Sequence, residues 1–174
     1  MIAKNIVLIG MPGAGKSTLG ILLAKQLGTD FVDTDILIQV DQGATLQEIL
    51  ELTDYLNLRR LEQQVLINLS GNGKVIATGG SAVYSEAGMQ QLKANGTVIF
   101  LDLSLTTLTE RVTDFDQRGI ACRPDQSFAD LFTERRPLYQ QYADITIDCD
   151  HQTPAQTLAK IVGDLFPVQD SAID

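Results

Sequence analysis

The sequence is poor in the residues that build zinc sites, disulfide frameworks and histidine-based active sites. Its 174 residues include two cysteines, one histidine and no tryptophan. Cys122 and Cys149 form no CxxC pair and have no nearby histidine suited to zinc. His151 stands in a polar stretch without a partner, so we expect it to be exposed to solvent. These scarcities indicate a reduced protein of the cytoplasm.

The chain also lacks long apolar runs, Pro/Gly-rich linkers and internal repeats. No stretch approaches the roughly 20 apolar residues that a transmembrane helix needs. The short apolar run Ile6–Ile9 ends at a glycine, which favours a buried strand over a signal peptide. We therefore expect a single domain over residues 1–167, followed by a polar tail over 168–174.

Positive charge is scarce, with 13 lysines and arginines against 22 aspartates and glutamates and a formal net charge of −9. Such a surface repels nucleic acids and anionic membranes, so we expect neither as a partner, and we expect a monomer. All seven arginines nevertheless fall in two clusters, Arg59–Arg60 and five residues between positions 111 and 136. The clustering favours a site for a small anion, and the alternative is a solvated helix face.

Short apolar runs alternate with amphipathic segments along the chain. Five runs rich in β-branched or aromatic residues predict strands at Ile6–Ile9, Phe31–Val32, Val75–Ala77, Val98–Leu101 and Ile145–Ile147. Helical patterns cover Thr18–Leu27, Leu46–Leu52, Leu58–Leu69, Glu86–Lys93, Thr106–Val112, Phe128–Gln141 and Ala155–Leu165. The alternation predicts an α/β fold whose parallel sheet is covered on both faces, with ligands beyond the carboxyl ends of the strands.

One motif carries a strong chemical signal. Residues 10–17 read GMPGAGKS, which fits G-x-x-x-x-G-K-[ST], and they follow a predicted strand and open a predicted helix. Glycines let backbone N–H groups surround a phosphate, Lys16 reaches the β- and γ-phosphates, and the Ser17 hydroxyl ligates Mg²⁺. The expected ATP ligands of this loop are Gly13, Ala14, Gly15, Lys16, Ser17 and Thr18.

Two carboxylates follow the second predicted strand and narrow the reaction class. Asp33 and Asp35 are two residues apart, which on an extended chain points both side chains to one side. One can anchor the Mg²⁺ shell while the other orients, or takes the proton from, an acceptor hydroxyl. The alternative is a helix cap, which Asp35 could supply alone for a helix beginning near Ile36. The chain has no NKxD guanine motif and no apolar strand ending in a Walker-B pair, which disfavours GTPases and oligomeric ATPases and favours a kinase.

At this point the sequence resembles a known family. The segments GMPGAGKSTLG, FVDTD, LRRLE, ATGGSAV and RRPLYQQYAD occur in the order and approximate spacing of shikimate kinases, over about residues 4–165. The resemblance implies a three-layer P-loop fold like that of nucleoside-monophosphate kinases, with a central five-stranded parallel sheet. It also implies transfer of phosphate from ATP, with Mg²⁺, to the 3-hydroxyl of shikimate in aromatic amino-acid biosynthesis.

The resemblance further assigns roles to single residues. It places Asp33 at the metal, Asp35 at the acceptor hydroxyls, Arg59 and Arg135 at the acceptor carboxylate, and backbone of Gly80 against the acceptor ring. Two guanidinium groups suit a carboxylate. Glu62, three residues after Arg59, looks like a buttress for that arginine, and the alternative is a surface pair. Helices over about 34–70 would bind the acceptor.

The resemblance also assigns an adenine-side arginine, Arg111, and more weakly Gln152 in a late loop. A lid over about 114–127 would carry Arg118 as the catalytic cation at the γ-phosphate. The lid departs from the family, because R-P-L-L has become Arg118-Gly-Ile-Ala, and a shifted alignment would make Arg123 the lid arginine. We expect Gly119 to loosen the lid and Gly119→Pro to stabilise it if the backbone φ permits proline.

Further departures leave the acceptor open. Ser81 replaces the third glycine of the usual G-G-G, and Asp54 and Tyr55 replace a G-E pair near the acceptor pocket. One alternative is a P-loop kinase of another small hydroxy acid or of a nucleotide. A second is a nucleotide-binding paralogue without turnover, motivated by the altered lid, although intact Lys16 and Asp35 argue against it.

Overall fold

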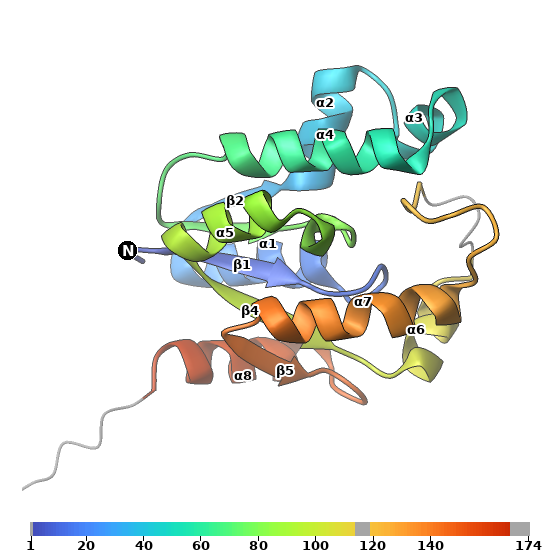
Figure 1. The fold of residues 1–174 in the computed structure, drawn as a ribbon. Helices are drawn as coiled ribbons and strands as arrows, with labels where there is room; N and C mark the ends of the chain where they lie inside the picture. The colour runs from blue at the N-terminus through green and yellow to red at the C-terminus, as the bar shows by residue number, and fades with distance from the viewer. Residues whose placement is uncertain (1, 114–118, 168–174) are drawn as a thin grey trace, which may run out of the picture.

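Five parallel strands form the central sheet of the computed structural model, which describes residues 2–113 and 119–167. The strand order is β2-β3-β1-β4-β5 (Figure 1). The strands are β1 (Asn5–Ile9), β2 (Asp30–Asp33), β3 (Lys74–Ala77), β4 (Gly96–Asp102) and β5 (Ile145–Asp148). Each contains its predicted run and is slightly longer, so the predicted parallel sheet is confirmed. The predicted tail over 168–174 lies outside the described residues.

The helices form layers on both faces of this sheet (Figure 1). Helices α1 (Lys16–Leu27) and α8 (Pro154–Leu165) cover one face, and α5 (Glu86–Asn95) and α7 (Phe128–Tyr142) cover the other. Helices α2 (Thr34–Gln42), α3 (Leu46–Leu52) and α4 (Tyr55–Asn68) pack together beyond the β2 edge. Helix α6 (Leu105–Arg111) and the 3₁₀ turn η1 (Ala82–Tyr84) both contact α7. None of these helices is long and apolar enough to cross a membrane, within the part of the chain that is described.

The main core lies between the sheet and its helices, and β1 is its centre. All five residues of β1 are buried, because the strand has neighbours on both sides and helices on both faces. A second, smaller cluster joins α2, α3 and α4 to the segment after α6. Its buried members are Ile38, Ile49, Leu58, Leu61 and Ala121. The segment that was expected to form a lid is therefore packed on the α2–α4 layer at Ala121.

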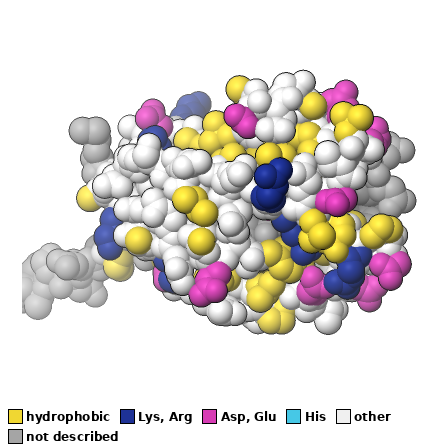
Figure 2. Space-filling view, turned by 45° about the horizontal axis from the view of Figure 1, so that its top comes forward, with side chains coloured by type: hydrophobic (Ala, Val, Ile, Leu, Met, Phe, Trp, Pro, Cys, Tyr) yellow, Lys and Arg dark blue, Asp and Glu magenta, His cyan; other side chains and the backbone are white. Residues whose placement is uncertain are grey.

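Helix α2 begins at Thr34, close to the helix start near Ile36 considered above, but it gave no amphipathic pattern because its apolar residues do not follow one buried stripe. Ile36 is 53% exposed and Val40 is 75% exposed, whereas Ile38 is buried. Figure 2, in which this part of the molecule comes forward, shows hydrophobic side chains gathered there. Helix α4 begins at Tyr55, earlier than the predicted Leu58, since the Asp54 side chain accepts a hydrogen bond from Asn57 N and caps it.

Candidate active site

The glycine-rich loop joins β1 to α1 in a backbone conformation that other residues rarely adopt. Gly13 and Gly15 have φ angles of 83° and 94°. A Cβ atom on Gly13 would lie 2.5 Å from Cγ2 of Val112, so the loop also has no room for a side chain there. Gly15 is the N-cap of α1 and brings no side chain to the open N–H groups of the helix. The loop therefore presents backbone donors and the positive end of a helix dipole to an anion.

Lys16 opens α1 with its ammonium group inside this loop. The side chain is buried, and Nζ donates hydrogen bonds to the backbone oxygens of Gly10 at 2.8 Å and Met11 at 2.9 Å. Burial lowers the pKa of Lys16 to about 8, although Asp35 opposes the shift. The lysine charge is thus held at the place where the loop amides would meet a phosphate.

Asp33 ends β2 and has two roles at once. Its Oδ2 atom accepts a hydrogen bond from the Ser17 hydroxyl at 2.5 Å, which joins the strand to the phosphate loop. Its Oδ1 atom accepts from the backbone N–H groups of Asp35 at 3.0 Å and Ile36 at 3.4 Å. Asp33 is therefore the N-cap of α2, so the alternative of a capping aspartate holds for Asp33 and not for Asp35. Asp33 can cap α2 because it precedes the first turn of the helix, whose backbone N–H groups have no partner within the helix.

Asp35 lies in the first turn of α2 rather than on an extended chain. It still borders one cavity together with Asp33 and Ser17, so the two carboxylates converge by a different backbone path from the one that their spacing predicts. Burial raises the pKa of Asp35 to about 6, and Lys16 opposes the shift. A carboxyl group with this pKa is mostly ionised at neutral pH and can accept a proton or a hydrogen bond.

Glu62 of α4 points into the cleft and does not pair with Arg59. The residue is buried, its Oε2 atom accepts a hydrogen bond from the Ser81 hydroxyl, and its Oε1 atom has no hydrogen-bond partner among the described residues. Burial and the neighbouring Asp35 raise the pKa of Glu62 to about 7. Both expectations for Glu62, the buttress and the surface pair, are therefore wrong. The turn of the helix carries Glu62 inward to Ser81 while Arg59 leans towards Tyr84.

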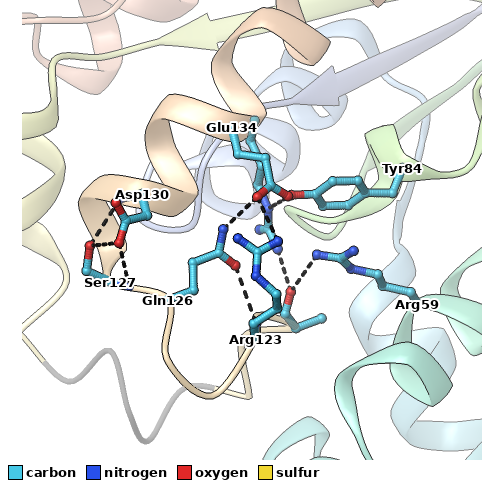
Figure 3. A network of polar contacts seen from close by, with 9 residues as sticks. Arg59, Tyr84, Arg123, Gln126, Ser127, Asp130 and Glu134 are labelled. Carbon is cyan, nitrogen blue, oxygen red and sulfur yellow. Dashed lines mark hydrogen bonds and ion pairs between the residues drawn. The ribbon is translucent and has the colours of Figure 1, made fainter.

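The two arginines predicted at the acceptor carboxylate converge on one backbone oxygen. Arg135 of α7 is 1% exposed, and its Nη2 atom donates to the oxygen of Ala121 at 2.7 Å. Arg59 of α4 donates to the same oxygen from Nη2 at 3.4 Å, and both bonds are drawn in Figure 3. The two guanidinium groups therefore lie close to each other at Ala121.

Gly80 lies between the phosphate loop and Arg135. A Cβ atom there would be 3.0 Å from both Nη1 of Arg135 and Cδ of Pro12, so the backbone fits closely on both sides. The Tyr139 hydroxyl donates to the oxygen of Gly80 at 2.6 Å and fixes the loop after β3. The approach of this backbone to a ligand stays a prediction.

Most of these residues share one cleft of about 430 Å³, which is within the usual range for small-molecule sites. Arg59 and Asp33 are not among the residues that line it, and Asp33 borders the neighbouring cavity with Asp35 and Ser17. It lies at the carboxyl ends of β1 and β3. The polar and charged residues lining it are Lys16, Ser17, Thr18, Asp35, Glu62, Thr78, Ser81, Arg111 and Arg135. The glycines and apolar residues lining it are Pro12, Gly13, Gly15, Ile38, Leu46, Leu58, Gly79, Gly80, Gly119, Ile120 and Ala121.

A smaller cavity of about 200 Å³ lies on the α8 side of the phosphate loop. Arg111 borders both cavities, and Gln152 borders only the smaller one. The other residues that line the smaller cavity are Ala14, Gly15, Thr18, Leu19, Cys149, Pro154 and Thr157. The two residues predicted on the adenine side therefore stand together beside the loop.

The described part of the predicted lid closes over the cleft from the α3 side. Gly119 N donates to Oε1 of Gln47 at 2.9 Å, and Gly119 has a φ of 62°. Proline cannot adopt that φ, so the condition for stabilisation by Gly119→Pro is not met. Arg118 lies outside the described residues. Arg123, the alternative lid arginine, forms an ion pair with Glu134 at 3.2 Å and does not line the cleft.

The arginine clusters are thus divided between the site and other contacts. Arg136 binds Asp102 through two hydrogen bonds of 3.0 and 2.7 Å, and Arg60 donates to Asn57 at 2.8 Å. Sequence reasoning also missed Tyr84, which contacts both acceptor-side arginines and bonds to Glu134. Its position in the sequence could have indicated this, because Tyr84 is four residues after Gly80 in the loop that follows β3.

Comparisons with known proteins agree on one family. A family model described as shikimate kinase matches residues 12–166. A shikimate kinase of Sulfurihydrogenibium sp. (strain YO3AOP1) is 36% identical over 160 residues, which cover 91% of this chain and 96% of the relative.

Solved structures give the same result. Shikimate kinase from Acinetobacter baumannii in complex with shikimate matches with a TM-score of 0.86 and 33% identity, covering 93% of this chain and 92% of that one. Shikimate kinase from Aquifex aeolicus matches with a TM-score of 0.80 and 34% identity, covering 92% and 95%.

Proposed function

The chain belongs to the shikimate kinase family, and from that premise we propose that its main cleft transfers the γ-phosphate of ATP to the 3-hydroxyl of shikimate. The products are ADP and shikimate 3-phosphate. One observation carries the proposal: the phosphate loop, Asp35 and Arg135 line the same cleft. A phosphoryl donor, an acceptor hydroxyl and an acceptor carboxylate can therefore be held together.

The nucleotide binds across the two cavities. The N–H groups of the loop and of the first turn of α1 hold the phosphates, and the smaller cavity beside Arg111 and Gln152 takes the adenine side. Lys16 exchanges the carbonyls of Gly10 and Met11 for phosphate oxygens. Arg118 supplies a further cation to the transferring group from the lid.

Ser17 and Asp33 fit the Mg²⁺ that the family implies. A hydroxyl and a carboxylate oxygen, 2.5 Å apart at the end of the phosphate loop, are the hard oxygen donors that this ion prefers. Mg²⁺ commonly keeps several waters and phosphate oxygens as its other ligands, so one carboxylate and one hydroxyl suffice. Bound there, it would neutralise charge on the β- and γ-phosphates.

The acceptor side combines a base with a carboxylate clamp. Asp35, with a pKa of about 6, is mostly ionised at neutral pH and orients the attacking hydroxyl or takes its proton. Lys16, with a pKa of about 8, is mostly cationic at the same pH. Arg59 and Arg135 bind the carboxylate of shikimate in place of the Ala121 oxygen, while Gly80 lies against the ring.

The remaining expectations concern the setting of the enzyme. We place the kinase in the cytoplasm, where ATP is supplied, as one domain over residues 1–167 that acts as a monomer. A net charge of −9 supports the absence of nucleic acid and anionic membrane among its partners.

An ADP-release assay with a panel of acceptors tests the proposal. Shikimate, quinate, gluconate and nucleoside monophosphates are each offered with ATP and Mg²⁺. We expect shikimate to support turnover and the others to give rates near the background hydrolysis of ATP. Turnover with another acceptor and none with shikimate would overturn the assignment of the substrate, and no turnover with any acceptor would favour a paralogue without activity.

A variant pair tests the role of Asp35. Asp35→Asn is expected to lower kcat by roughly 10²–10⁴-fold with a smaller change in the KM for shikimate, because the carboxylate acts on the hydroxyl in the transition state. Asp41→Asn, on the exposed part of the same helix, is the matched control. Equal effects of the two substitutions would contradict the role.

A further inference from the structure

Tyr84, at the end of η1, contacts both of the arginines assigned to the acceptor carboxylate. The guanidinium carbon of Arg59 lies 3.6 Å from the centre of the Tyr84 ring, and that of Arg135 lies 5.3 Å from it. Nε of Arg135 also donates to the Tyr84 hydroxyl, at a long distance of 3.4 Å. Figure 3 shows Arg59 beside Tyr84 at the edge of the polar network. One side chain therefore borders both cations.

The ring of Tyr84 is the nearer of two aromatic rings beside Arg59, since the centre of the Tyr55 ring lies 5.1 Å from the guanidinium carbon. A cation over an aromatic face is attracted within about 6 Å of the ring centre, and the distance of 3.6 Å is well inside that limit. Nε of Arg59 is buried without a hydrogen-bond partner in the described part of the chain. Among residues 2–113 and 119–167, its guanidinium group donates one hydrogen bond, of 3.4 Å, to the oxygen of Ala121. The position of Arg59 thus depends on the ring more than on hydrogen bonds.

The hydroxyl of Tyr84 is anchored from the opposite side. It donates a hydrogen bond to Oε1 of Glu134, the residue before Arg135 on α7. Oε2 of Glu134 accepts from Nε2 of Gln126 at 2.7 Å and from Nη1 of Arg123 at 3.2 Å (Figure 3). The anchor is therefore shared by α7 and by the segment that closes over the cleft.

The chain offers a contrast in Tyr139, whose contacts are those of a core residue. Tyr139 is fully buried, its ring stacks on Phe100 at 5.2 Å, and its hydroxyl binds the backbone of Gly80. Tyr84 is only half-buried and its ring faces a cation instead of the core. Burial raises the pKa of Tyr84, which keeps the phenol protonated and able to donate to Glu134.

We propose that Tyr84 is a positioning residue for the acceptor carboxylate: its ring holds Arg59 and its Glu134-anchored hydroxyl steadies Arg135, so that both guanidinium groups face one point. This inference rests on the proposed function, because it assumes that the two arginines bind a carboxylate. Tyr84 itself does not touch the reacting atoms, so its removal affects acceptor binding and leaves the chemical step in place.

Titration calorimetry with shikimate and with its methyl ester tests the proposal. Tyr84→Leu is expected to weaken shikimate binding roughly 3- to 30-fold, since it removes the cation–π contact. Tyr84→Phe keeps the ring and is expected to lose less, roughly 2- to 10-fold, through the missing hydroxyl. The ester lacks the carboxylate charge and should bind more weakly than shikimate. Its affinity should be the same for the wild type, Tyr84→Leu and Tyr84→Phe. The KM for ATP and kcat at saturating shikimate should also be unchanged.

A double-mutant cycle shows whether Tyr84 acts through Arg59. In the Arg59→Ala background, Tyr84→Leu is expected to cause much less loss of shikimate binding than in the wild type. Tyr142→Leu, near the end of α7 that is remote from the cleft, controls for removal of a half-buried tyrosine. If Tyr84→Leu does not fold, Tyr84→Phe alone must still weaken shikimate binding relative to the ester.

Three results would overturn the inference: unchanged shikimate binding in both Tyr84 variants, equal losses for shikimate and ester, or additive losses with Arg59→Ala. Failure of the proposed function looks different, because the wild-type protein itself would then not bind shikimate.

Discussion

The donor side and the acceptor side of the cleft are built in different ways. The phosphate loop of the donor side is continuous in sequence, and it offers backbone N–H groups and Lys16 to a ligand, with Arg111 and Gln152 beside it. The acceptor side gathers side chains from α2, α4, the loop after β3 and α7, and the segment around Ala121 closes it. The first depends on the backbone angles of a few glycines, and the second depends on contacts between segments far apart in the chain.

This difference extends to electrostatics. Asp35 and Glu62 both border Gly79, and burial raises the pKa of each. The cations that face them are Lys16 and Arg135. On the acceptor side the ionisable groups therefore shift one another's pKa values, and a substitution at one of them changes the pKa of the others. The donor side joins this coupling through Lys16 and Asp33, both of which act on the pKa of Asp35.

The largest effect is expected on the donor side, for Lys16→Ala. Loss of the ammonium group should lower kcat by about 10²–10³-fold, since it stabilises charge on the transferring phosphate. Lys25→Ala, in the last turn of the same helix, is the matched control. Steady-state kinetics and shikimate titration together check the comparison. If Lys16→Ala weakens shikimate binding as strongly as it lowers kcat, the donor and acceptor sides do not differ in the way described above.

Glu62→Gln examines the coupled charges of the acceptor side. The pKa of Glu62 is about 7 in the folded protein against an ordinary value of 4.5, so the folded state binds more protons between these values. The contribution of Glu62 to the free energy of unfolding of the wild type is fully present below pH 4.5, and it is lost as the pH rises through 7. Glutamine has no such loss, so the variant should gain stability relative to wild type, by up to about 3 kcal/mol above pH 7.

Urea unfolding of both proteins at pH 4.5 and at pH 8 measures this difference. Glu110→Gln, on the exposed surface of α6, should show no pH-dependent gain. A gain for Glu62→Gln that is equal at the two pH values would mean that Glu62 does not titrate as a buried, desolvated acid.

Much of the fold and the donor side could be predicted from local sequence. Buried strands such as Val75–Ala77 and the turn-forming glycines before Lys16 produce their structures from residues close in the chain. The position of Asp33 beside Ser17 also followed, because parallel strands end at one edge of the sheet, although β3 lies between β2 and β1. The family resemblance, now supported over residues 12–166, supplied the identity of the acceptor.

The errors lie on the acceptor side, where side-chain direction depends on packing. Glu62 and Arg59 are three residues apart on one helix, a spacing that fits an ion pair, yet Ser81 and Tyr84 draw them apart. The contact between Arg59 and Ala121 joins residues 62 positions apart, and no local pattern encodes it. Only the start of helix α2, near Ile36, was expected, because its exposed face is also apolar at Ile36 and Val40 and hides the amphipathic pattern.

Arg59→Ala tests whether the acceptor arginines act on the acceptor alone. Removal of a charge-assisted contact to the carboxylate should weaken shikimate binding by about 1.5–3 kcal/mol, or roughly 10- to 150-fold. Arg60→Ala is the matched control, since the Arg60 side chain is exposed and donates to Asn57 on the same helix. Calorimetry with ATP alone should give wild-type affinity for both variants. A comparable loss of ATP affinity in Arg59→Ala would show that the two sides are not separable.

The smallest effect is expected from a pair of glycine substitutions with opposite signs. Gly119 has a φ of 62°, and a Cβ atom there would lie 2.6 Å from Cβ of Leu46, so Gly119→Ala should loosen the segment from α3. The cost of the positive φ alone is about 1–2 kcal/mol. Gly163 lies within α8 with open space around it, and Gly163→Ala should instead stabilise the protein by about 0.5–1 kcal/mol. Hydrogen exchange of the Gly119 amide, bonded to Gln47, reports the first effect, and urea unfolding reports the second.

Faster exchange at position 119 with an unchanged midpoint of global unfolding would show that closure of the acceptor side is a local equilibrium. Wild-type exchange in Gly119→Ala would mean that the segment tolerates a side chain against α3, contrary to the packing seen there.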